Sequence, residues 1–238
     1  MIRVFCDFDG TLATEDIGRE IFLKFAGADA AVLGAQYVNG EITARECLVR
    51  EAAAVVGAQP GQLHAFIDQF RADPTFGEFR AFCDGHEIPI VVLSDGLDVY
   101  VERILRRGGF GDIAFFANHL SFAGEGSTTK LHVSFPHTDS ECEFCGNCKR
   151  NHMLTGSGDD DVIVYIGDGI SDRCPVHYAD VVFAKKSLIR YCQKENISYH
   201  EFSDFTDIQR RLESMLQKKR MHPRREAAMA RRDVFMQG

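Results

Sequence analysis

Several features that mark other classes of protein are missing from this chain of 238 residues. No stretch approaches the roughly 20 consecutive apolar residues that a membrane-spanning helix needs. The first residues read Met-Ile-Arg-Val-Phe-Cys-Asp and lack the longer apolar region of a secretory signal peptide. We therefore expect a cytoplasmic protein with no membrane partner.

An excess of positive charge is missing as well. The formal net charge is −8 at pH 7, and general binding to nucleic acids rests on neutralising phosphates with Lys and Arg. We therefore expect no nucleic-acid partner. The exception is a basic C-terminal tail, residues 218–238, which is either a solvated helix end or frayed terminus, or a functional basic patch.

Cysteine, in contrast, is plentiful, with eight residues. In a cytosolic chain of this length, cysteines are more often buried thiols or metal ligands than a disulfide framework. Cys142, Cys145 and Cys148 are spaced three residues apart, and the last directly precedes Lys149. This spacing suits packed reduced thiols, a structural zinc site completed by a histidine, or a redox role. The sequence leaves these three alternatives open.

The hydrophobic pattern alternates between short apolar runs and amphipathic segments. Buried strands are expected at 2–6, 88–93, 113–117, 162–166, 181–184 and 197–202, mostly with helices between them. Such alternation predicts an α/β fold with a doubly wound parallel sheet that is covered on both faces.

One long helical stretch breaks the alternation after the first strand. It predicts a small helical cap over residues 14–75, inserted into a catalytic core formed by residues 1–13 and 76–217. The basic tail then occupies residues 218–238.

Clusters of polar residues lie at or just beyond the ends of the predicted strands, where open parallel sheets bind ligands, with one lysine in the stretch before the strand at 162–166. In chain order these clusters are Asp7-Phe8-Asp9-Gly10-Thr11, Ser94-Asp95-Gly96, the single Lys149, and Gly167-Asp168-Gly169-Ile170-Ser171-Asp172. Taken alone, each cluster also fits a tight turn or a surface lysine. Their order and their common placement favour one site for a phosphate ester.

The residue types suit phosphoryl transfer. A carboxylate such as Asp7 can attack phosphorus when a divalent cation offsets the repulsion between two anions. Mg²⁺ prefers a few carboxylate ligands, which Asp7 and Asp168 can supply. Asp9 is free to act as general acid and base. Ser94 and Lys149 can hold the phosphoryl oxygens.

These four motifs resemble those of the haloacid dehalogenase superfamily. The resemblance implies that Asp7 is the nucleophile and Asp9 the general acid/base. It implies that the phosphate is held around Ser94, Asp95, Gly96 and Lys149. It also implies a Mg²⁺ ion bound by the Asp7 carboxylate, the Asp9 backbone carbonyl and Asp168, with Asp172 as a further acidic group nearby. Because dehalogenases keep only the first aspartate, Asp9 speaks against dehalogenation.

The cap position resembles the phosphoserine-phosphatase-like branch of that superfamily. Gly167 to Pro175 and the cysteine run before Lys149 are similar to two phosphatase groups. One acts on 2-hydroxy-3-keto-5-methylthiopentenyl-1-phosphate in methionine salvage, and the other on phosphoethanolamine and phosphocholine. Asp16 departs from the Glu that phosphoserine phosphatases carry there, which speaks against phosphoserine. Arg45 or Arg50 either contacts a substrate carboxylate or forms salt bridges within its helix.

The sequence therefore predicts a Mg²⁺-dependent phosphomonoesterase that acts on a small phosphorylated metabolite through an aspartyl-phosphate intermediate. The alternatives are a phosphotransferase on the same scaffold, a phosphoserine phosphatase, or an idle binding protein that retains the pocket. The substrate and the oligomeric state are left open.

Overall fold

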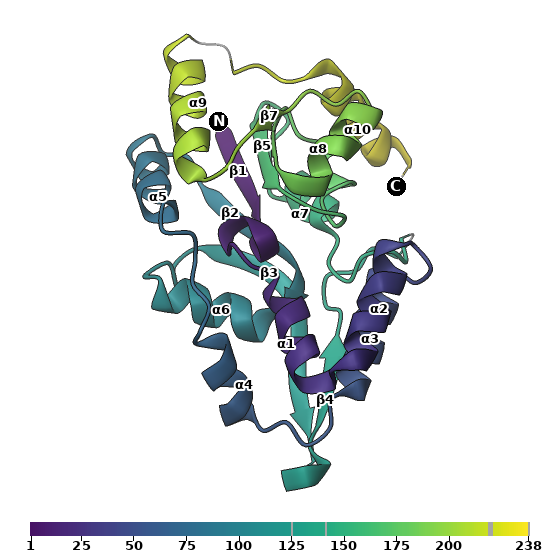
Figure 1. The fold of residues 1–238 in the computed structure, drawn as a ribbon. Helices are drawn as coiled ribbons and strands as arrows, with labels where there is room; N and C mark the ends of the chain where they lie inside the picture. The colour runs from purple at the N-terminus through teal and green to yellow at the C-terminus, as the bar shows by residue number, and fades with distance from the viewer. Residues whose placement is uncertain (125, 141, 219–220, 238) are drawn as a thin grey trace. The chain divides into compact units, whose positions relative to one another are not determined.

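The computed structural model describes residues 1–124, 126–140, 142–218 and 221–237 (Figure 1). The chain forms two compact units. The first unit comprises Met1–Leu12, Asp73–Leu93 and Lys149–Gly238. The second unit comprises Ala13–Ala72 and Ser94–Cys148.

Seven strands hydrogen bond in the order β4-β3-β2-β1-β5-β6-β7. Those of the first unit are β1 (Ile2–Asp7), β5 (Val162–Gly167), β6 (Val181–Ala184), β7 (His200–Glu201) and the first half of β2 (Ile90–Leu97). They all pair in parallel. Every residue of β5 is buried, as expected for a strand covered on both faces. The predicted α/β class with a mostly parallel sheet is confirmed.

The helices of the first unit are α5 (Phe76–Gly85), α7 (Lys149–Thr155), α8 (Lys186–Lys194), α9 (Phe205–Gln217) and α10 (Arg225–Gln237), with short turns η1 (Phe8–Leu12) and η3 (Pro175–His177). Helices α5 and α9 lie side by side (Figure 1). Their contact is aromatic, because the centroid of the Phe205 ring lies 4.9 Å from that of Phe76 and 5.3 Å from that of Phe79. Asp204 caps the N-terminus of α9, because its carboxylate accepts the Thr206 and Asp207 amides.

Two regions of the first unit differ from the sequence-based expectation. The strand expected at 197–202 is limited to His200–Glu201, which pair with Phe183 and Ala184 at the end of β6. The segment expected to be a basic tail contains α10. Its Arg231 contacts the Tyr178 carbonyl at 2.6 Å and the buried Asp180 carboxylate at 3.2 Å. Residues 219–220 and 238 of that segment lie outside the described residues.

The second unit is built from helices and one antiparallel strand pair. Its helices are α1 (Ile17–Ala26), α2 (Ala28–Val38), α3 (Ala44–Ala54), α4 (Pro60–Ile67) and α6 (Asp98–Arg107), with a short turn η2 (Gly126–Thr128). Its strands are the second half of β2, β3 (Ala114–Ala123) and β4 (Lys130–Ser134). The four helices α1 to α4 follow β1 in the chain, which confirms the predicted helical insertion.

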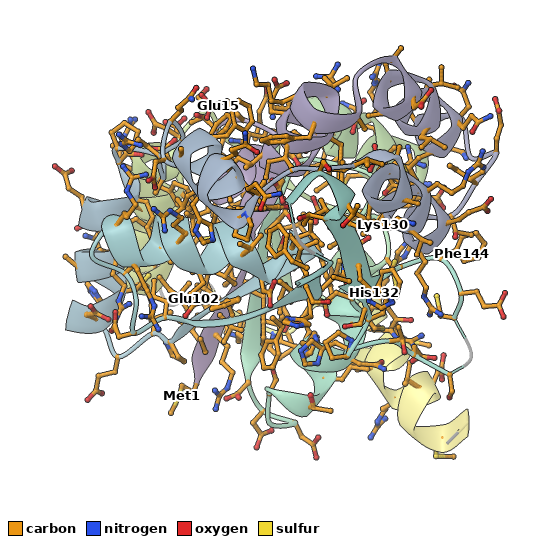
Figure 2. All side chains as sticks on the ribbon, turned by 90° about the horizontal axis from the view of Figure 1, so that it is seen from below. Met1, Glu15, Glu102, Lys130, His132 and Phe144 are labelled. Atoms are coloured by element: carbon orange, nitrogen blue, oxygen red, sulfur yellow. The ribbon has the colours of Figure 1, made fainter. Side chains whose placement is uncertain are left out.

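Strand β4 pairs antiparallel with β3 and was not predicted. Its side chains alternate between buried Leu131 and Val133 and exposed Lys130 and His132, the latter two labelled in Figure 2. A run of only two apolar residues among polar ones is a weak strand signal in sequence.

Within the described part of the chain, every helix is too short or too polar to cross a bilayer.

Candidate active site

The first predicted motif lies where β1 ends. Asp7 is the last residue of β1 and stands opposite Leu93 of β2. The chain then turns through η1, in which Gly10 has a φ of +72°. A Cβ atom on Gly10 would lie 2.3 Å from Asp168 Oδ2. Glycine is therefore required where this turn passes close to the acidic loop that follows β5.

Lys149 is the centre of a buried network. Its Nζ donates to Asp7 Oδ1 at 2.5 Å, Asp172 Oδ1 at 2.7 Å and Ser171 Oγ at 3.0 Å. These three acceptors use the three N–H groups of the ammonium. Lys149 and Asp7 are each only 3% exposed, so the contacts form away from bulk water. The structure thus brings the predicted lysine and the predicted nucleophile together.

The electrostatics of this network follow from burial and charge balance. Burial alone would lower the pKa of Lys149, but the Asp172 and Asp7 carboxylates outweigh it and raise that pKa well above its usual value. Lys149 is therefore a permanent cation here. Burial and the charge of Asp172 raise the pKa of Asp7, and the Lys149 ammonium opposes that shift.

Asp172 is held on both carboxylate oxygens. Oδ1 accepts Lys149 Nζ and, at 2.6 Å, the Tyr165 hydroxyl. Oδ2 accepts the Asp168 and Gly169 amides at 2.8 and 2.9 Å. A Cβ atom on Gly167 would lie 2.5 Å from Oδ2, so that glycine makes this approach possible. Four donors fill the acceptor capacity of one carboxylate.

The donor set suits a hard divalent cation. One oxygen each of Asp7, Asp168 and Asp172 lies within 4.8 Å of the others. Because Asp172 is filled by its four donors, Asp7 and Asp168 are the carboxylates with capacity left for a metal. Burial and then Asp172 raise the pKa of Asp168, while Lys186, 2.8 Å away, opposes the shift. A bound cation would offset the same crowding of negative charge, so the residues fit Mg²⁺.

The second predicted motif, Ser94-Asp95-Gly96, lies in the second unit. It is hydrogen bonded to Gly146 and Asn147, which follow Cys145 in the chain. Ser94 is fully buried, and its Oγ accepts the Gly96 amide at 3.0 Å. The Asp95 carboxylate accepts the Gly146 and Asn147 amides at 2.8 and 2.9 Å. Asp95 therefore uses its side chain to hold the chain just before Lys149.

The predicted specificity residues of the second unit have defined partners. Asp16 caps α1, because its carboxylate accepts the Arg19 amide at 3.0 Å. Arg45 donates to the backbone carbonyls of Cys142 and Cys145. Arg50 forms an exposed ion pair with Glu46 at 3.2 Å.

In the described part of the chain, the thiols of the cysteine run are not grouped as metal ligands. Among the residues that the structure describes, the three aspartates Asp7, Asp168 and Asp172 are the group of potential ligands that come within 4.8 Å of one another. The thiols of Cys142, Cys145 and Cys148 form no such group, and none of the eight cysteines, all of which lie in the described residues, is in a disulfide. Structural zinc is therefore unsupported.

Several residues near the predicted motifs were missed by sequence reasoning. Tyr165 contacts Asp172, Ser171 contacts Lys149, and Lys186 contacts Asp168. Asn147 is fully buried and donates to the Ser94 and Phe116 carbonyls at 2.8 and 2.9 Å. Tyr165 had a usable signal, because a phenol inside an otherwise apolar strand needs a partner. Ser171 lies inside the fourth motif but was given no role there, and Lys186 and Asn147 carried no signal.

Comparisons with known proteins give a consistent result. A family model described as haloacid dehalogenase-like hydrolase matches residues 4–174. A 2-hydroxy-3-keto-5-methylthiopentenyl-1-phosphate phosphatase of Bacillus cereus is 33% identical, over 92% of this chain and 99% of that protein. A Bacillus thuringiensis protein of the same name has the same identity and coverage.

Solved structures share the fold. A phosphoserine phosphatase with an analogue of its phospho-aspartyl intermediate aligns with a TM-score of 0.65 and 18% identity, over 91% of this chain and 98% of that one. A phosphoserine phosphatase from T. onnurineus aligns with a TM-score of 0.63 and 16% identity, over 87% and 92%. At such identities the likeness concerns the fold.

Proposed function

Because this chain belongs to the haloacid dehalogenase-like hydrolase family and is a phosphoric monoester hydrolase within it, we propose that it hydrolyses 2-hydroxy-3-keto-5-methylthiopentenyl-1-phosphate through an aspartyl-phosphate intermediate. The family membership confirms the resemblance that the four motifs indicate. The observation that best supports the chemistry is the network in which Lys149 joins Asp7 to Asp172.

In the first half-reaction, an Asp7 carboxylate oxygen forms a bond to phosphorus while the ester P–O bond breaks. The departing alkoxide takes a proton from Asp9. Lys149 stays protonated and lies 2.5 Å from Asp7 Oδ1, so its charge is next to the reacting atoms. There it offsets the negative charge that spreads over the phosphoryl oxygens.

In the second half-reaction, water attacks the phosphorus of the aspartyl phosphate. Asp9, now ionised, accepts a proton from that water, the Asp7–phosphorus bond breaks, and inorganic phosphate leaves. Asp7 returns as a carboxylate and Asp9 as an acid, so the enzyme is unchanged. Asp9 has an extended backbone (φ −70°, ψ 125°) inside η1, distinct from the turn at Gly10.

Magnesium belongs to this proposal because the donor set fits it. The Asp7 and Asp168 carboxylates, with the backbone carbonyl of Asp9, would hold the ion. When bound, it supplies positive charge that offsets repulsion between the nucleophile and the substrate phosphate. The resemblance to the family also implies phosphate contacts from Ser94 and Gly96. The Asp95 side chain holds the chain before Lys149, because its Oδ1 accepts two amides there.

The substrate assignment rests on the similarity to the Bacillus phosphatases, which covers nearly the whole chain. Two observations in the second unit speak against phosphoserine. Asp16 is a shorter acid than the Glu of phosphoserine phosphatases and is engaged in capping α1. Arg45, a candidate for gripping a substrate carboxylate, donates to two backbone carbonyls instead.

A panel assay tests the proposal. The full chain with Mg²⁺ should hydrolyse 2-hydroxy-3-keto-5-methylthiopentenyl-1-phosphate with a higher kcat/KM than phosphoserine or phosphoethanolamine, and excess chelator should stop turnover. A clear preference for phosphoserine would overturn the substrate and leave the chemistry intact. Added alcohol acceptors would reveal a phosphotransferase through phosphorylated acceptor in place of inorganic phosphate.

The stereochemistry at phosphorus tests the covalent step separately. A substrate whose phosphoryl group is made chiral with oxygen isotopes should release inorganic phosphate with net retention of configuration, because attack by Asp7 and then by water each invert the phosphorus. Net inversion would mean direct attack by water.

A further inference from the structure

Tyr165 is a buried phenol at the centre of the first unit. It lies on β5 between Val164 and Ile166, and all three side chains are fully buried. Its hydroxyl donates to Asp172 Oδ1 at 2.6 Å. A phenylalanine would fill the same apolar volume, so packing alone does not account for a hydroxyl at this position.

The oxygen that Tyr165 contacts is the one that Lys149 contacts. Asp172 Oδ1 accepts Tyr165 at 2.6 Å and Lys149 Nζ at 2.7 Å. The other oxygen, Oδ2, is fixed by two backbone amides of the acidic loop. The Tyr165 hydroxyl therefore helps to orient Oδ1 of Asp172. Oδ1 in turn orients one of the three N–H groups of the Lys149 ammonium.

Sharing the oxygen also moderates the ion pair. A carboxylate oxygen that already accepts a short hydrogen bond offers less negative charge to its second partner. Without the phenol, Asp172 would bind the ammonium more tightly, at the expense of the two contacts that Lys149 makes with Asp7 and Ser171.

We propose that Tyr165 is a positioning residue for phosphoryl transfer, which acts through Asp172 to direct the Lys149 ammonium toward the Asp7 oxygen. The inference rests on the proposed function, because the direction of Lys149 matters for catalysis only if Asp7 attacks phosphorus. The charge of Lys149 is needed most when negative charge spreads in the transition state. The effect therefore falls on kcat more than on substrate binding.

The test compares Tyr165→Phe with the unmodified full chain in the presence of Mg²⁺. We expect kcat to fall about tenfold, as for the loss of one hydrogen bond to a charged group, with KM changed less than about twofold. Orthovanadate, which adopts the five-coordinate geometry of the transition state, should inhibit more weakly by a similar factor. Inhibition by inorganic phosphate should change little. An unchanged kcat, or an equal weakening of vanadate and phosphate, would overturn the inference.

A matched control and a double-mutant cycle separate positioning from a general loss of structure. Tyr191→Phe removes a phenol that hydrogen bonds His177 Nε2 at 2.9 Å in the same unit, and its kcat should be unchanged.

The double-mutant cycle tests the route through Asp172. If Tyr165 acts through Asp172, adding Tyr165→Phe to Asp172→Asn should not lower kcat further. Additive losses in kcat, or an equal loss in Tyr191→Phe, would contradict the inference.

Two further outcomes keep the test decisive. If Asp172→Asn does not fold, the ratio of vanadate to phosphate inhibition in Tyr165→Phe decides alone. Activity that survives in Asp7→Asn would instead refute the proposed function. An inactive Asp7→Asn beside an unimpaired Tyr165→Phe would refute only the role of Tyr165.

Discussion

Both units bury carboxylates, but those at Asp7 and Asp172 and that at Glu51 have opposite surroundings. In the first unit, Asp7 and Asp172 flank the Lys149 ammonium at 2.5 and 2.7 Å. In the second unit, Glu51 on α3 is 8% exposed, and the groups that act on it are the Cys47 thiol and the Asp16 carboxylate. Burial is the largest influence on Glu51 and, despite the Cys47 hydrogen bond, raises its pKa from 4.5 to about 7.

The difference shows what a buried cation contributes. Taking a charge out of water is unfavourable, and a group without a counter-ion responds by becoming neutral. Glu51 responds in this way near neutral pH. Lys149 does not, because the two carboxylates beside it keep it charged. The buried Lys149 of the first unit thus stays charged, as the proposed chemistry requires, whereas the buried Glu51 of the second unit becomes neutral more readily.

The largest expected effect tests whether the charged network is catalytic. Asp7→Asn keeps the shape of the side chain but removes the nucleophile and a proposed metal ligand, so turnover should fall to background. Asp9→Asn is the matched control, since it removes proton transfer alone and should cost about 10²–10⁴-fold. Steady-state hydrolysis of the preferred substrate measures both. Equal losses in the two variants would argue against different roles for the two aspartates.

The next effect concerns stability. Lys149→Met removes the cation and leaves Asp7 and Asp172 buried without it, which should lower the free energy of unfolding by about 3–5 kcal/mol at pH 8. The control is Lys186→Met, because Lys186 also pairs with a carboxylate at 2.8 Å but is 54% exposed. That exposed pair should contribute less than about 1 kcal/mol. Urea unfolding of the metal-free protein measures both, and similar losses would contradict the importance of burial.

Much of the first unit could be predicted from sequence because its signals are local. The strands before Asp7 and Gly167 are short apolar runs that end in acidic and glycine residues, and such runs identify parallel strands directly. Asp7, Asp168 and Asp172 meet because parallel strands end at one edge. Tyr165 of β5 contacts Asp172. That contact depends on the face of the strand from which the Tyr165 side chain projects, and the sequence does not specify this face.

The second unit was harder to predict because its key contacts join distant segments through the backbone. Asp95 holds the amides of Gly146 and Asn147, and Asn147 reaches the carbonyl of Phe116. Backbone amides and carbonyls are present at every residue, so such pairings leave no residue-specific signal. The docking of Arg231 on Asp180 was missed for a related reason, since a basic run near a chain end usually indicates a solvated segment.

The third prediction examines the unpaired carboxyl of the second unit. The pKa of Glu51 is about 7 in the folded protein and near 4.5 in the unfolded chain. Above pH 4.5 the unfolded chain ionises first, so the unmodified protein should lose stability as pH rises to about 7 and change little beyond. Glu51→Gln has no such group. Its stability relative to the unmodified protein should therefore rise by up to about 3 kcal/mol between pH 4 and pH 8.

Denaturant unfolding at several pH values measures this difference. Cys47→Ser is a useful second variant, because it keeps a hydroxyl donor for Glu51 and removes the thiol. A pH-independent difference between Glu51→Gln and the unmodified protein would mean that Glu51 ionises in the folded state as it does in the unfolded chain. The contrast between the two units would then not hold.

The smallest effect concerns a carboxylate that lies between these two extremes. The side chain of Asp180 is fully buried and pairs with Arg231 at 3.2 Å, but its carboxylate also accepts the Ile163 and Arg224 amides, each at 2.8 Å. Arg231→Ala should therefore cost only about 1–2 kcal/mol, because two amide donors remain on the carboxylate when the cation is lost. Urea unfolding gives the global value, and limited proteolysis should show earlier cleavage within α10, whose contact with the Tyr178 carbonyl is also lost. Arg232→Ala, at the neighbouring position on the same helix, controls for helix propensity and charge. A loss in Arg231→Ala as large as that in Lys149→Met would mean that a buried carboxylate depends on its cation whether or not amides support it, and the distinction drawn between supported and unsupported charges would fail.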